Sequence, residues 1–294
     1  MWDQISSNKF KSAALIAVFI ALVALIGFVF GQVTDWGYLG LVLALGVALA
    51  MSVGSYWFSD KIVLSMSRAR PVDRELEPYL VNTVEGLSIA AGLPVPRAYV
   101  IDDPAPNAFA TGRNPENAAV AVTSGLLAMM NRQELEGVLA HELAHIKNYD
   151  TLLQTLAAVL AGSVTLISEW MLRSFWWGGR DRNRDSGQLG AILMVVAIVL
   201  ALLSPLAATL IQMAISRRRE FLADASAAML TRYPPGLASA LRKIGGDQNQ
   251  LRAANKATES LYIVNPLRAR GRGMNSLFNT HPPLAERIAL LEAM

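Results

Sequence analysis

The sequence predicts a mostly helical integral membrane protein of the α+β class, with about four transmembrane helices. Three observations support this prediction. Of the 294 residues, 53% are hydrophobic and only 17% are charged, which argues against a disordered chain and a wholly soluble one. Four apolar runs are long enough to be candidate spans. The stretches between and after these runs carry polar helical patterns and short β-branched segments.

Charge and cysteine content narrow the possible functions. The 26 basic and 23 acidic residues give a net charge of +3, an excess too small to favour nucleic acid as a partner. The chain has no cysteine, which excludes disulfides, zinc ribbons, thiol nucleophiles and iron–sulfur clusters. Any metal must therefore be bound by His, Asp or Glu.

Two apolar runs open the chain and form the first predicted domain, residues 1–60. No charged residue occurs from Ser12 to Thr34 or from Trp36 to Ser59, and each run exceeds the roughly 20 residues that span a bilayer. We interpret the first run as a retained anchor, because no small-residue cleavage pattern follows it; a cleaved signal peptide is the alternative. Basic residues follow the second run, which predicts that the N-terminus and the next domain are cytoplasmic. They are Lys61, Arg68, Arg70 and Arg74.

Residues 61–150 have the pattern of a small cytoplasmic subdomain. A polar helix is predicted over Glu75–Ala91, and the sequence Gly92-Leu93-Pro94 ends it. Short β-branched runs at Arg97–Ile101 and Ala118–Thr123 predict strands. This subdomain is therefore the α+β part of the chain.

Residues 151–216 are predicted to form a hydrophobic helical hairpin, the third and fourth spans. Its apolar runs are Thr151–Ser168 and Ser186–Ser216, both long enough to cross a membrane. The linker Glu169–Asp185 contains four arginines, which resist an external position under the positive-inside rule. The alternatives are a buried hairpin of a large core and a pair that dips into the membrane without crossing it. Residues 217–294 then form a soluble helical part, with helices over Pro235–Ile244 and after Pro283.

The strongest motif is H-E-x-x-H, found at His141-Glu142-Leu143-Ala144-His145. Asn131 and Glu134 form a capping box ahead of it, so the motif is expected to lie within a helix. Four-residue spacing puts both imidazoles on one helix face, where they can share one metal ion, with Glu142 beside the bound water. The alternative is a helix face whose histidines are paired with backbone or carboxylate groups.

A catalytic tetrahedral zinc site needs a third protein ligand and keeps its fourth position for water. One candidate is His281, the third and last histidine, in the turn Thr280-His281-Pro282-Pro283. The others are Glu220 and Asp224, four residues apart on a predicted helix. One of these carboxylates can bind the metal while the other accepts the second N–H of a ligand histidine. The alternative for the pair is a solvated face, paired with the neighbouring arginines.

Helical rise supports a shared site for the two ends of the hairpin. His145 lies about 9 Å before Thr151, and Glu220 about 6 Å after Ser216, so both emerge at a similar depth. They must also emerge on the same side of the membrane. The chain must therefore cross the membrane an even number of times between them, which the two predicted spans satisfy.

On these residues the chain resembles the HtpX-type membrane zinc metalloproteases, relatives of the CAAX prenyl-protein proteases. The resemblance covers nearly the whole chain and includes the stretch Asn107–Gly112. It implies a zincin-like catalytic domain with one zinc ion per subunit, ligated by His141, His145 and Glu220. In this family Glu142 would be the catalytic carboxylate, and Asp224 would orient a ligand histidine.

The resemblance also implies a location and a role. The protein would be a multi-pass protein of the bacterial inner membrane, with its active site in the cytoplasm. It would be a zinc endopeptidase that clears damaged or misfolded membrane proteins under stress. Membrane proteins, unfolded polypeptides and the lipid bilayer are the expected partners, and cleavage is expected near the cytoplasmic surface rather than within the membrane.

The expected mechanism assigns proton transfer to Glu142. Zinc lowers the pKa of a bound water towards about 7, so Glu142 is expected to take its proton and pass it to the departing amine. We expect His281 to stabilise the negative oxygen of the tetrahedral intermediate, with Arg272 as a rival.

Substrate is expected to bind as an added β-strand, because main-chain pairing holds an extended peptide without demanding particular side chains. The candidate edges are Ala118–Thr123 and the stretch that begins at Asn107, for which a simple turn is the alternative. The predicted substrate-binding residues are Asn107, Ala108, Phe109, Ala110 and Thr111.

Two other classes fit parts of the pattern. A prenyl-protein protease could use the same zinc site, although its larger hydrophobic chamber calls for more spans than the four predicted. A transporter or scaffold with a structural metal is disfavoured, because transport sites place polar groups in mid-membrane and these spans carry almost none.

Overall fold

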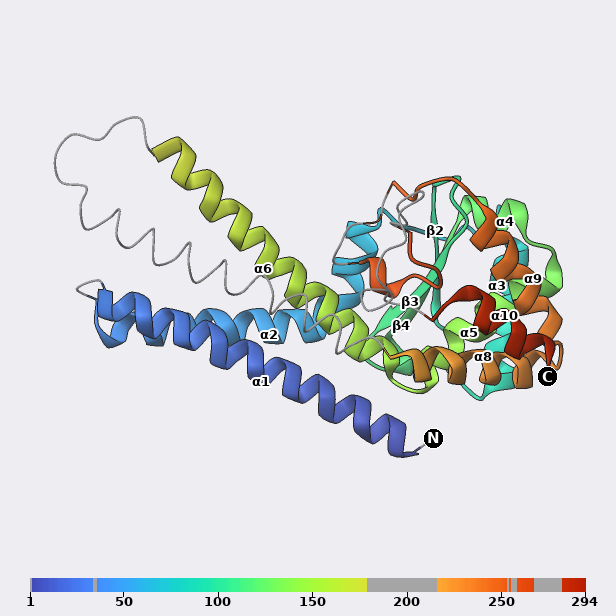
Figure 1. Cartoon of the computed structure of the whole chain (residues 1–294), viewed down its shortest axis with the longest axis horizontal. Coiled ribbons are helices and arrows are strands. Elements are labelled where there is room, and N and C mark those ends of the chain that lie inside the picture. The colour runs from blue at the N-terminus through green and yellow to red at the C-terminus, as the bar shows by residue number, and fades with distance from the viewer. Residues whose placement is uncertain (1, 34–35, 179–215, 253, 255–257, 267–281) are drawn as a thin grey trace.

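A computed structural model describes residues 2–33, 36–178, 216–252, 254, 258–266 and 282–294 (Figure 1). Long helices extend from one side of a rounded domain that contains a small sheet and the shorter helices. The protein is therefore mostly helical with an α+β domain, as the sequence predicts.

The first two predicted spans are a helical hairpin, α1 (Trp2–Val33) and α2 (Tyr38–Met66). Both are long and apolar enough to cross a membrane, and only 22% of the most apolar window of each is buried within the chain. Such exposed apolar surface suits lipid contact. Near the connecting turn the backbones touch, since a Cβ on Gly31 would overlap the carbonyl of Gly37. Small residues permit this close packing of helices.

The third predicted run begins helix α6 (Asp150–Gly178), which continues through part of the predicted linker. The part of α6 whose side chains the structure describes, Asp150–Val164, is apolar. It is buried, because its leucines pack against Leu15 and Phe19 of α1, and Val159 packs in the cluster beneath the sheet. The fourth run lies outside the described residues as far as residue 215, so the third and fourth spans stay predictions.

Four strands form one sheet in the order β1-β2-β4-β3. They are β1 (Arg70–Pro71), β2 (Arg97–Ile101), β3 (Ala108–Gly112) and β4 (Ala118–Thr123). β2 and β4 are parallel, while β1 and β3 pair antiparallel at the two edges. The predicted strands β2 and β4 are confirmed. β3 was not predicted as a strand, because it is buried on both faces and small residues replace the alternating pattern.

Helices cover both faces of the sheet. On one face Ala108 and Ala110 pack in a core with α3 (Pro78–Ala91) and α5 (Arg132–Lys147). On the other face Phe109 packs in a cluster with α2 and α6. The remaining helices are α4 (Ser124–Met129), α8 (Arg217–Thr231), α9 (Pro234–Gly246) and α10 (Leu284–Glu292), with 3-10 turns η1 (Pro115–Asn117) and η2 (Glu259–Leu261).

The predicted capping box fixes the start of α5, the helix that carries the H-E-x-x-H motif. The Glu134 backbone N–H donates to Asn131 Oδ1 over 3.0 Å, and the Asn131 N–H donates to Glu134 Oε2 over 2.8 Å. Glu134 also accepts from Ser239 and Lys243 of α9, at 2.6 and 2.7 Å. The cap therefore anchors α5 to a neighbouring helix as well as starting it.

We predict that Asn131→Ala lowers the free energy of unfolding by about 0.5–2 kcal/mol, because it leaves an N-terminal N–H of α5 without its acceptor. The measurement is thermal unfolding of the detergent-solubilised protein. Arg132→Ala is the control: it is one residue further on, 78% of its side chain is exposed, and its ion pair with Glu136 lies on the surface. Equal melting temperatures for the two variants would contradict the prediction.

Candidate metal centre

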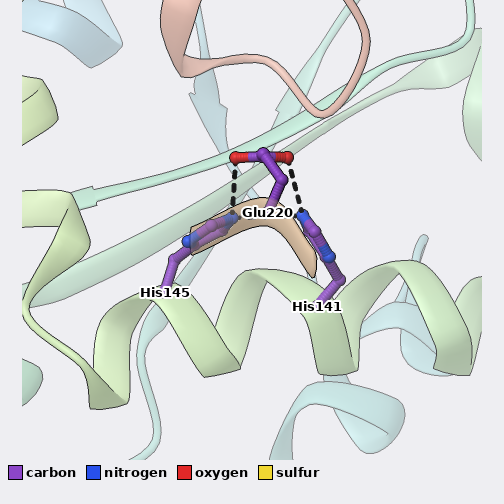
Figure 2. Close-up of side chains that lie close together, drawn as sticks. All are labelled: His141, His145 and Glu220. Atoms are coloured by element: carbon purple, nitrogen blue, oxygen red, sulfur yellow. Dashed lines mark hydrogen bonds and ion pairs between the residues drawn. The ribbon is translucent and has the colours of Figure 1, made fainter. Parts of the chain in front are cut away.

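The structure brings together the three residues predicted to bind the metal. His141 and His145 lie on α5 and Glu220 on α8, and all three are buried. The two Nε2 atoms are 3.1 Å apart. The Glu220 oxygens lie 3.7 Å from His141 Nε2 and 3.6 Å from His145 Nε2. Figure 2 shows both rings rising from one face of α5 towards the carboxylate.

These separations fit a small divalent cation. Two ligands that bind a tetrahedral zinc ion at 2.0–2.1 Å are about 3.3 Å apart, which is close to the three observed distances. The facing Nε2 atoms also point to a cation, because two imidazole lone pairs aimed at one point repel each other. His141, His145 and Glu220 are therefore a candidate metal site of the chemistry that zinc prefers.

Two carboxylates contact the histidines at Nδ1, the ring nitrogen that faces away from the metal site. His141 Nδ1 is 2.9 Å from Asp224 Oδ1, and His145 Nδ1 is 3.0 Å from Asp150 Oδ2. A carboxylate at Nδ1 keeps the proton there and leaves Nε2 free to bind metal. The predicted partner Asp224 lies where the sequence analysis expected it. Asp150, the first residue of α6, was missed.

A fully buried arginine, Arg287 of α10, completes the cluster. Its Nε and Nη2 donate to the two oxygens of Asp224 over 2.7 and 2.6 Å, and its Nη1 lies 3.3 Å from Glu220 Oε2. A buried charge is tolerated when it is paired in this way. Sequence reasoning missed Arg287, although it lies on the apolar stripe of its helix with Leu284 and Ile288, where a charged residue needs a reason.

The electrostatics of the cluster favour positive charge at its centre. Burial disfavours the charged imidazole, but the hydrogen bonds to Asp224 and Glu220 outweigh it and raise the pKa of His141 to about 9. Burial alone would raise the pKa of Asp224, but the charge and hydrogen bonds of Arg287 hold that pKa below its usual range. The lowered pKa of Asp224 keeps that carboxylate ionised beside His141, where its charge favours a cation.

Glu142 is placed to transfer protons. Its side chain is buried beside the two histidines, and Oε1 has no hydrogen-bond partner among the described residues. Burial and the nearby Glu220 raise its pKa, and the positive charges of His141, His145 and Arg287 only partly offset this. A carboxylate with a raised pKa and a free oxygen suits a general base that takes a proton from water.

The predicted substrate-binding residues lie on or just before β3. β4 is paired on both sides, by β2 and β3, so the alternative of an added strand along Ala118–Thr123 is wrong. At the open edge of β3, Ala108 O accepts from Ile263 N over 2.9 Å, and Asn107 Nδ2 donates to Val264 O over 2.8 Å. The chain itself therefore occupies the beginning of this edge.

The side chains of Phe109 and Thr111 have structural contacts. The Phe109 ring packs edge-on against Tyr262, with the centroids 5.1 Å apart, and Thr111 Oγ1 is 3.1 Å from Thr155 Oγ1 of α6. Because pairing alternates along an antiparallel strand, the backbone of Ala110 faces the edge away from β4. A substrate role for this stretch stays a prediction. The predicted roles of His281 and its rival Arg272 concern residues outside the described part of the chain.

Comparison with known proteins gives consistent matches. The model of peptidase family M48 matches residues 74–294. A protease HtpX homolog of Dictyoglomus turgidum is 46% identical over 293 residues, covering all of this chain and 94% of the relative. Another, of Streptococcus pneumoniae, is 47% identical over 300 residues and covers both chains completely. The crystal structure of S. mikatae Ste24p has a similar fold, with a TM-score of 0.50, 17% identity, and coverage of 99% of this chain and 67% of that one.

We predict that Asp150→Asn weakens metal binding about tenfold or more, because it removes the charge that orients the His145 ring and keeps its proton on Nδ1. Affinity is measured by titration of zinc against a competing chelator. Asp102→Asn is the matched control, since 71% of that side chain is exposed and it contacts only Arg70 among the described ion pairs. If the two variants bound zinc equally well, Asp150 would have no part in the metal centre.

Proposed function

This chain belongs to peptidase family M48, and from that premise we propose that it is a zinc endopeptidase that cuts membrane proteins at the cytoplasmic face. The family match and the full-length HtpX relatives make it a membrane metalloprotease. The use of zinc, the side of the membrane and the substrates are the parts that we propose. The observation that carries the proposal is the convergence of His141, His145 and Glu220 on one buried point.

Glu142 is the general base of the proposed reaction. A zinc ion bound by the two histidines and Glu220 would supply Lewis acidity towards water and the peptide carbonyl. Glu142 takes the proton of the attacking water on its unpartnered oxygen and passes it to the leaving amine. Asp150 and Asp224 keep the protons of His145 and His141 on Nδ1, so that both Nε2 atoms face the reaction site. His281 remains the proposed donor to the oxyanion.

An extended peptide binds beyond Ala108, along the edge of β3 where no described strand pairs. Main-chain pairing there would be independent of sequence, which suits damaged or unfolded substrates. A cavity of about 500 Å³ lies before the start of β3, lined by Asn107, residues of the 244–251 stretch and residues 264–266.

The metal centre lies close to the membrane surface. Twenty residues of helix cover about 30 Å, the thickness of the hydrocarbon core, so α2 reaches the far boundary near Phe58. The basic residues that follow α2 favour the cytoplasm for the domain beyond it. Loops and tails of membrane proteins near that surface are the proposed substrates, with the lipid bilayer as the surrounding partner.

We predict that Glu142→Gln keeps its metal but loses at least about 10²-fold in cleavage rate, the size of a general-base contribution. Glu220→Ala should lose both metal and activity, because it removes a ligand. Metal analysis and digestion of casein by the purified, detergent-solubilised variants test both expectations. Removal of metal by a chelator should abolish wild-type cleavage, and zinc should restore it. Wild-type activity in Glu142→Gln would remove Glu142 from the mechanism.

We also predict the side of the membrane that the domain faces. Because the chain has no cysteine, a single cysteine can be introduced by Glu75→Cys in the domain or by Trp36→Cys in the turn between α1 and α2; both positions are exposed. A membrane-impermeant thiol reagent applied to intact cells should label Trp36→Cys and spare Glu75→Cys. Labelling in the opposite pattern would place the active site outside the cell.

A further inference from the structure

The first membrane helix reaches the metal centre. Asn8 of α1 is buried, and its Nδ2 donates to Asp150 Oδ1 over 2.7 Å and to the carbonyl of Asn148 over 2.9 Å. The other oxygen of Asp150 is 3.0 Å from His145 Nδ1. A chain of two hydrogen bonds therefore connects helix α1 to a candidate metal ligand that is far away in the sequence.

Asp150 depends on this contact. Its carboxylate is buried, and a buried charge is costly unless its oxygens are hydrogen-bonded. His145 satisfies Oδ2, so among the described residues Oδ1 depends on Asn8 and on Arg219 of α8, whose Nη1 is more distant at 3.6 Å. The amide oxygen of Asn8 in turn lies 3.5 Å from Arg219 Nη1. Both ends of the amide are used, so its orientation is determined.

The neighbouring residue of α1 holds the same turn between α5 and α6. Tyr149 has a φ of +59°, a left-handed conformation that is unfavourable for a residue with a bulky side chain. Lys9 Nζ lies 4.4 Å from the centre of the Tyr149 ring. Asn8 and Lys9 together therefore contact all three residues of the junction, 148–150, and stabilise a backbone conformation that local preferences disfavour.

We propose that Asn8 is a positioning residue of the metal centre. It holds Asp150 in the orientation that fixes the His145 ring, so the N-terminal membrane helix forms part of the active site as well as the anchor. This inference rests on the proposed function, because it takes His145 as a metal ligand. Asn8 touches neither metal nor substrate and acts only through Asp150.

The test compares metal binding by full-length variants in detergent, independently of proteolysis. Asn8→Ala removes both donated hydrogen bonds, and Asn8→Asp keeps the size of the side chain but sets a second carboxylate against Asp150. Ser12→Ala is the control on the same helix, since buried Ser12 donates only to the Asn8 carbonyl of its own helix. The probes are zinc competition titration and the visible absorption spectrum of bound Co²⁺, which reports ligand geometry.

We expect Asn8→Ala to bind zinc about three- to tenfold more weakly, below the effect of residues that contact a ligand directly. Asn8→Asp should lose more zinc affinity than Asn8→Ala. Both Asn8 variants should have a shifted Co²⁺ absorption spectrum, whereas Ser12→Ala should have the affinity and the spectrum of the wild type. Wild-type affinity and spectrum in both Asn8 variants would overturn the proposal.

A double-mutant cycle separates positioning from general stability. If Asn8 acts through Asp150, adding Asn8→Ala to Asp150→Asn should cost much less affinity than it costs in the wild type. Additive losses would overturn the proposal even if the single variants are weakened. A wild-type protein that binds no divalent metal would refute the proposed function itself, whereas unchanged affinity in the variants refutes only the role of Asn8.

Discussion

Balance of buried charge is the constraint on which the rest of the structure depends. Around the centre, four buried carboxylates face two buried guanidinium groups: Glu142, Asp150, Glu220 and Asp224 against Arg219 and Arg287. With all six groups ionised, the part of the chain that the structure describes leaves two negative charges without a compensating charge here, and charges without partners are costly away from water. A divalent cation between the histidines would supply the missing charge. The raised pKa of His141 has the same origin, since its surroundings favour whatever carries positive charge there.

The fold meets this constraint by collecting groups from five separate helices. α5 supplies the two histidines and Glu142, α8 supplies Glu220 and Asp224, and α6, α10 and α1 supply Asp150, Arg287 and Asn8. The sheet and its core position α5, while α1 and α6 pack against each other beside it. Membrane hairpin and catalytic domain therefore meet at the reaction centre, which explains why the domain is not simply tethered to its anchor.

Much of this site could be predicted from sequence because its chemistry is local. The H-E-x-x-H motif, its capping box and the Glu220–Asp224 pair depend on helical spacing alone, and the structure brings their side chains together. Asn8 could not be found this way, since its contact with Asp150 joins segments 142 residues apart. Asp150 lies only five residues after His145, but α5 ends at Lys147 and the left-handed Tyr149 lies between them, so helical spacing does not predict their contact. Strand β3 was not predicted, because its residues are buried on both faces and therefore show no alternation of apolar and polar side chains. Arg287 was detectable, as a charge on the apolar stripe of its helix.

The place of Arg287 in the chain has a consequence for biosynthesis. Helix α10 follows every other contributor to the cluster, so it is the last of them to leave the ribosome. Until α10 packs against the other helices, Asp224 and Glu220 lack the neighbouring guanidinium group of Arg287. The ion pairs of the cluster are therefore complete only after the anchor helices have been made.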